Sequence, residues 1–61
     1  KMDIVEKIEL NKKIRKYEGS DGFISSLKRE LKYKWCKSDI YNGKTVKILS
    51  DKQYEVAKSI L

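Results

Sequence analysis

The residues best suited to chemistry are basic, and most of them lie in one third of the chain. Between positions 28 and 47 there are seven cations and two acids, so this segment carries +5 of the net charge of +6. Such a concentration suits a surface that faces phosphates, because each neutralised phosphate releases condensed counterions. Lysine outnumbers arginine thirteen to two, which favours attraction to a nucleic-acid backbone over bidentate reading of bases. The predicted contact residues are Lys28, Arg29, Lys32, Lys34, Lys37, Tyr41, Lys44 and Lys47.

Aromatic rings are interleaved with these lysines in the stretch "KYKWCKSDIYNGK" at residues 32–44. We expect Tyr41 to be exposed beside the turn and to be the ring available for base stacking or cation–π contacts. We expect Phe23 and Trp35 in the core, because the chain has few other large hydrophobic residues. The alternative is that the cations form only the solvated face of a lysine-rich protein.

A second basic stretch, "NKKIRK" at residues 11–16, closes the first expected helix. Positive charges at a helix C-terminus complement the helix dipole, which is the simplest account of them. They extend the nucleic-acid face instead if the first helix packs with this end toward the other cations.

Catalytic and metal-dependent chemistry is not expected. The chain has no histidine, one cysteine, and no glycine-rich phosphate loop, so we predict no catalytic residue, no metal site, no cofactor and no small-molecule substrate. Lys34 and Lys37 are close enough in sequence to lower the pKa of Cys36, but a small half-buried hydrophobic residue is the favoured interpretation. A single unpaired cysteine is typical of a reducing compartment, so we predict a cytoplasmic location, in the host cell if the chain is viral.

The main alternative partner is an acidic protein surface. In that case the chain is a small interaction module, such as a viral inhibitor or an accessory domain, that docks through Trp35, Ile40 and Tyr41 with a rim of lysines. No apolar run approaches the roughly 20 residues of a membrane span, so no membrane partner is predicted.

The elements that must position these residues are short. Sixty-one residues support one small domain, 1–61, either complete or an accessory part of a longer chain. We expect the first helix to begin near Asp3 and Glu6, with these two residues as a capping pair. Its apolar stripe is broken: Ile4, Val5, Ile8, Ile14 and Tyr17, with Leu10 beside it.

The second helix is predicted from about 22 to about 34, with Ser20 or Asp21 as its N-cap and an apolar face made by Phe23, Ile24, Leu27 and Leu31. The pair Asn42-Gly43 predicts a type I′ hairpin turn between two short strands, within residues 36–49. A capping box of Ser50 and Gln53, with Leu49 and Tyr54 as a hydrophobic staple, starts the last helix. We therefore predict an α+β fold in the order α-α-β-β-α, with one short antiparallel hairpin packed on the helices.

One motif resembles a known type of protein. "DGFISSLKREL" and "ILSDKQYEVAKSIL" carry a Phe-x-x-x-Leu-x-x-x-Leu helix followed by a Leu-Ser-x-x-Gln helix start. The pattern is similar to a small helical motif of phage and mobile-element proteins of DNA metabolism. The matching positions are Phe23, Leu27, Leu31, Leu49, Ser50 and Gln53. The resemblance implies an accessory helical module of viral or phage origin, and the hairpin between the two helices is a departure from the pattern.

Overall fold

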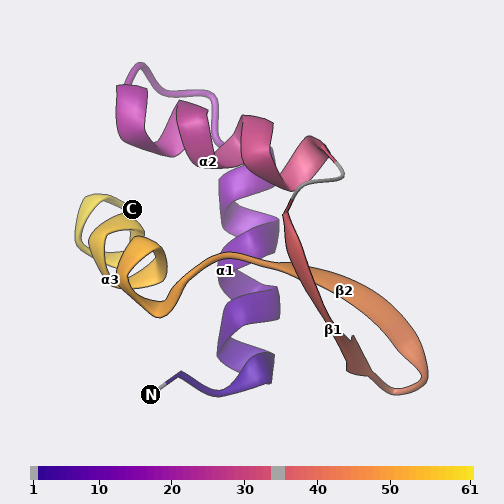
Figure 1. Ribbon diagram of the computed structural model, residues 1–61. Coiled ribbons are helices and arrows are strands. Elements are labelled where there is room, and N and C mark those ends of the chain that lie inside the picture. The colour runs from indigo at the N-terminus through magenta and orange to yellow at the C-terminus, as the bar shows by residue number, and fades with distance from the viewer. Residues whose placement is uncertain (1, 34–35) are drawn as a thin grey trace.

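The computed structural model describes residues 2–33 and 36–61. Within these residues there are three helices and a two-stranded hairpin, and the hairpin lies beside the helices (Figure 1). The order is α1 (Ile4–Lys16), α2 (Gly22–Lys32), β1 (Lys37–Tyr41), β2 (Lys44–Ile48) and α3 (Asp51–Ile60). The predicted α+β fold and its α-α-β-β-α order are confirmed.

Local signals explain where α2 and α3 begin. The Asp21 carboxylate accepts a hydrogen bond from the Ile24 backbone N–H at 3.0 Å, so Asp21 is the N-cap of α2. The predicted capping box of α3 is present, with Ser50 and Gln53 bonding each other's backbone N–H groups. α2 ends at Lys32, two residues earlier than expected, and residues 34–35 lie outside the described part of the chain.

The first helix begins where the sequence indicates but without the expected side-chain cap. Asp3 is the N-cap residue, yet its carboxylate makes no capping hydrogen bond. Its backbone carbonyl instead accepts the Lys7 N–H at 3.1 Å. α1 is therefore stabilised by its packing and by basic residues in its last turn rather than by a capping pair.

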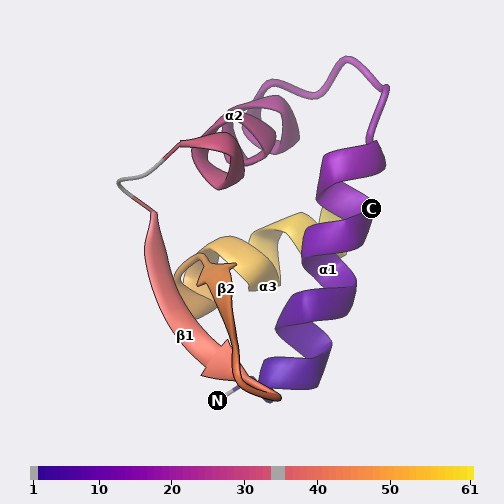
Figure 2. The same cartoon turned by 90° about the vertical axis from the view of Figure 1, so that its right-hand side faces the viewer.

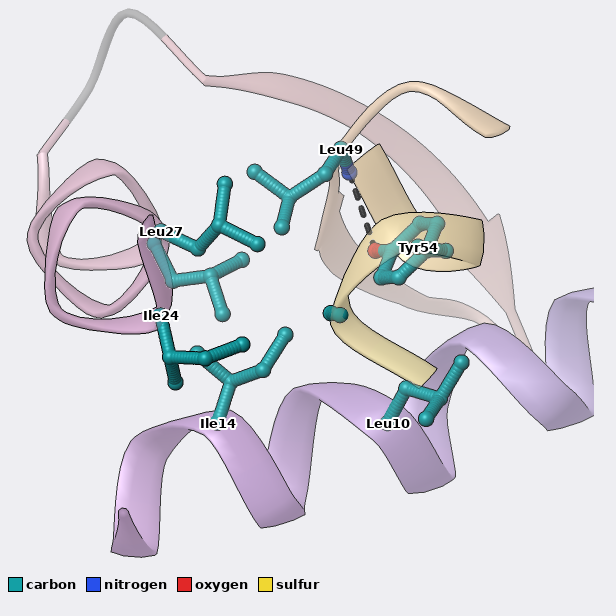
Figure 3. Close-up of a cluster of buried hydrophobic side chains, with 8 residues drawn as sticks. Leu10, Ile14, Ile24, Leu27, Leu49 and Tyr54 are labelled. Atoms are coloured by element: carbon teal, nitrogen blue, oxygen red, sulfur yellow. Dashed lines mark hydrogen bonds between the residues drawn. The ribbon is translucent and has the colours of Figure 1, made fainter. Parts of the chain in front are cut away.

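The core lies where the three helices meet, and β2 leads into it (Figure 3). Its buried apolar residues are Leu10, Ile14, Ile24, Leu27, Leu31, Leu49, Tyr54 and Ala57. Two residues expected in apolar stripes are excluded from it, since Phe23 is 37% exposed and Val5 is 44% exposed. Ile24, Leu27 and Leu31 form the buried face of α2, which leaves Phe23 at its edge in the first turn.

A buried asparagine occupies the gap in the apolar stripe of α1. Asn11 is 1% exposed, and its amide N–H donates to the Lys47 carbonyl at 2.8 Å. Its amide oxygen accepts from the Tyr54 hydroxyl at 2.8 Å, and that hydroxyl accepts from the Leu49 N–H at 2.9 Å (Figure 3). This network joins α1, the end of β2 and the first turn of α3, with its polar atoms satisfied.

The hairpin has the predicted turn. Asn42 and Gly43 have φ of 53° and 75°, as a type I′ turn requires. The register pairs Tyr41 with Lys44 and Ile40 with Thr45. Since the pair that closes a two-residue turn exchanges both backbone hydrogen bonds, the Ile40 N–H points away from β2, where it donates to the Asp39 carboxylate at 2.8 Å.

Packing on the helices is carried chiefly by β2, which contacts α1 (Figure 2). Opposite residues share a face, so Tyr41 and Val46 lie on one face and Ile40 on the other. Tyr41 and Val46 are half-buried, whereas Ile40 is 71% exposed. One face of the hairpin is therefore partly covered at Tyr41 and Val46, whereas Ile40 on the other face is open to solvent.

The buried network predicts that removing the Tyr54 hydroxyl group lowers the stability of the protein. Tyr54→Phe leaves the Leu49 N–H and the Asn11 amide oxygen without their partner, so we expect the free energy of unfolding to fall by about 1–3 kcal/mol. Urea denaturation measures it. Tyr41→Phe is the matched control, since no hydrogen bond to its hydroxyl is found among the described residues, and should change stability by less than about 0.5 kcal/mol. Equal effects of the two changes would contradict the network.

The backbone conformations of Gly43 and Gly22 predict that substitution by alanine changes stability in opposite directions at the two positions. Gly43→Ala places a side chain at φ of 75° and should destabilise the protein by about 1–2 kcal/mol. Gly22 begins α2, and a Cβ there has no heavy atom within 4 Å; Gly22→Ala should stabilise by about 0.4–1 kcal/mol. Thermal unfolding of both variants checks the pair, and a stabilising Gly43→Ala would rule out the assigned turn.

Candidate basic site

Three basic side chains from two helices line one hollow on the surface. Its residues are Arg15 from the last turn of α1 and Lys28 and Lys32 from α2, and its volume is about 250 Å³. Lys28 and Lys32 are four residues apart, so they lie on the same side of α2. Because α1 packs against α2, Arg15 meets them from the neighbouring helix.

The backbone beneath each of these cations is fixed by the core. Arg15 follows Ile14, Lys28 follows Leu27 and Lys32 follows Leu31. Ile14, Leu27 and Leu31 are each no more than 2% exposed. The fold therefore sets the positions from which the three flexible side chains extend.

Lys28 is also held by a hydrogen bond to the end of α1. Its ammonium group donates to the Tyr17 carbonyl at 2.8 Å, a favourable place for a cation next to the negative end of a helix. The Tyr17 hydroxyl in turn accepts the Asp21 N–H at 3.0 Å, which ties the loop between the helices to the same point. An ammonium group has three N–H donors, so Lys28 keeps two for a ligand.

The charge of this hollow is not neutralised by nearby acids. Among the described residues, no carboxylate lines it. Within residues 2–33 and 36–61, the ion pairs are Lys7–Asp51, Lys12–Glu9 and Lys58–Glu6. Glu30, the acid of the basic segment on α2, instead accepts hydrogen bonds from the Gln53 amide at 3.2 and 3.5 Å. The hollow is consequently a site of positive potential.

The structure brings only part of the predicted basic set together. Lys28 and Lys32 share the hollow with Arg15, which the sequence placed in the second basic stretch. Arg29 and Lys44 are exposed and do not line this hollow. Lys34 lies outside the described residues.

The remaining predicted residues differ in their surroundings. Lys37 lines a separate hollow together with Glu30, so its charge has an acid nearby. Lys47 is half-buried, with its carbonyl bound by Asn11. The expectation of an exposed Tyr41 is wrong, because Tyr41 is half-buried on the covered face of the hairpin. Its ring lies on the same face of the hairpin as Val46, which is also half-buried, and this shared face accounts for the difference.

The second hollow contains the cysteine but not an activated nucleophile. Its volume is about 210 Å³, and it is lined by Glu30, Cys36, Lys37, Ile48, Leu49, Ser50 and Gln53. Burial raises the pKa of the Cys36 thiol and Glu30 raises it further, while Lys47 and Arg15 act in the opposite direction. The thiol donates to the Ile48 carbonyl at 3.1 Å. The net shift of the Cys36 pKa is upward, and Lys37 is not among the groups that lower it, while Lys34 lies outside the described residues. Cys36 is half-buried, as the favoured interpretation expects.

Within the described residues there is no group of three or more acidic or cysteine side chains able to hold a metal ion. None of the helices in that part of the chain combines the length and apolar character needed to cross a membrane.

Comparisons with protein-family models, curated proteins and solved structures give no significant match.

The environment of Cys36 predicts slow thiol chemistry. Because only the thiolate reacts and the pKa is raised above the ordinary value of 9.0, alkylation by iodoacetamide at pH 7.5 should be slower in the folded protein than in urea. The rate should climb with pH and show its midpoint above 9.0. Mass spectrometry of quenched samples measures the rate, and a midpoint below that of the unfolded chain would contradict the assignment.

Proposed function

We propose that the protein is a non-catalytic nucleic-acid-binding module that contacts the phosphate backbone. The observation that carries the proposal is that Arg15, Lys28 and Lys32 line one hollow, with no carboxylate beside them in the described part of the chain. Cations without acidic partners attract phosphates and displace the counterions condensed on them. The resemblance to a phage motif supports a role in viral or phage DNA metabolism.

Backbone contact is favoured over base recognition. Two of the three cations in the hollow are lysines, which act on phosphates as point charges rather than as planar forks that match a base edge. Tyr41, the ring expected to stack on bases, is half-buried. We therefore propose binding with weak sequence preference, dominated by electrostatics.

A second candidate function is docking on an acidic protein surface. The high exposure of Ile40, at 71%, favours it, because an exposed large apolar side chain is available to a partner. However, Ile40 and Tyr41 lie on opposite faces of the hairpin, so they do not form the single patch that was expected. Trp35, the third residue of that patch, lies outside the described residues.

Salt dependence tests the nucleic-acid proposal. Three phosphate contacts give a slope of log affinity against log salt of about −2 for single strands and about −3 for duplexes. Fluorescence anisotropy with labelled random-sequence 20-mers, between 20 and 200 mM salt, measures this slope. Lys28→Gln and Lys32→Gln should each reduce its magnitude by about 0.7–0.9.

Lys52→Gln is the matched control, since it removes the same charge from an exposed position on α3. Its neighbour Asp51 pairs with Lys7 in the first half of α1, toward the opposite end of that helix from Arg15. The control should leave the slope unchanged. Undetectable binding of both strand types at 20 mM salt would exclude the proposed function, and binding of an acidic protein surface would then become the leading candidate.

A further inference from the structure

We infer that the hollow lined by Arg15, Lys28 and Lys32 is a site for a phosphomonoester dianion, such as the 5′-phosphate at the end of a nucleic-acid strand. This inference deepens the proposed function and rests on it for its biological setting. It assigns one kind of phosphate to one place on the surface, in addition to general attraction along the backbone.

The number of charges favours a terminal phosphate over an internal one. A phosphomonoester carries about −1.5 to −2 at neutral pH and offers three acceptor oxygens, whereas an internal phosphodiester carries a single negative charge. Of the residues that the structure describes, three cations and no carboxylate line the hollow. Their charge is matched far better by a dianion than by one internal phosphate.

The arrangement of the donors points the same way. Arg15 comes from α1 and the two lysines come from α2, so basic side chains reach the hollow from two helices. A terminal phosphate offers three acceptor oxygens to such donors, whereas an internal phosphate has only two oxygens that are not bonded to the strand.

The donors are of the kinds that hold phosphate in proteins. The Arg15 guanidinium offers a planar pair of N–H groups that match two phosphate oxygens. Lys28 is tethered by its bond to the Tyr17 carbonyl, so it loses less freedom when it binds. Lys32 lies one turn further along α2 and supplies the third charge.

The test compares oligonucleotides that differ only at their 5′ end. We expect a 12-mer with a 5′-phosphate to bind about tenfold more tightly than the same 12-mer with a 5′-hydroxyl, from three solvent-accessible charge pairs of ordinary strength. Arg15→Lys keeps the charge but removes the planar fork of the guanidinium, so it should lower this preference, taken as the ratio of the variant's affinities for the two strands. Lys52→Gln should alter neither quantity.

Amide chemical shifts locate the site and separate the two sources of the phosphate. Titrations with inorganic phosphate and with a nucleoside 5′-monophosphate should shift the amides around Arg15, Lys28 and Lys32, and the corresponding nucleoside should not. If these small ligands shift those amides but neither 12-mer binds, the hollow is a site for free phosphomonoesters and the proposed function fails while the inference holds. If the two 12-mers bind equally and the small ligands shift none of these amides, the inference is overturned and the proposed function stands. If nothing binds, both are overturned.

Discussion

The structure depends on the hydrogen bonds that Asn11 makes at the centre of the fold. Its amide accepts from Tyr54 and donates to the Lys47 carbonyl, and Tyr54 also receives the Leu49 N–H. These contacts connect segments 36 and 43 residues apart in sequence. Apolar contacts alone tolerate small shifts of one helix against another, whereas buried polar atoms need their partners at fixed distances. The network therefore sets how α1, β2 and α3 are placed relative to one another.

That constraint reaches the basic hollow through α1. Asn11 and Ile14 are one turn apart on the buried side of the helix, and Arg15 follows directly. α1 is thus fixed on its inner side by Asn11 and Ile14 while its last turn presents Arg15 toward α2. α2 has the same arrangement. Leu27 and Leu31 are buried, and the residue after each of them, Lys28 or Lys32, lines the hollow. In both helices a buried residue is followed directly by a cation. The packing of the core therefore sets where the backbone of each cation lies.

The elements were predictable from sequence because they have local causes. Capping of α3 by Ser50 and Gln53 and the turn at Asn42-Gly43 each depend on residues close in the chain. The site was only partly predictable, because the grouping of Arg15 with Lys28 depends on how α1 packs on α2. Asn11 left a detectable signal, since it interrupts the apolar stripe of α1 at a core position, but its partners are distant in sequence. Phe23 was misplaced because its spacing fits the α2 stripe, while its position in the first turn leaves it at the edge.

Two side chains bind backbone groups on the outer edges of the hairpin. These contacts affect whether a second copy of the chain could pair with those edges. A two-stranded sheet has two open edges, and unpaired edge groups can template pairing with another chain. On β2 the Lys47 carbonyl is bound by Asn11, and on β1 the Ile40 N–H is bound by Asp39. One group on each edge is therefore already occupied, and both strands are only five residues long. Exposed charges at Lys37 and Asp39 further disfavour edge-to-edge pairing of the hairpin with a second copy of the chain.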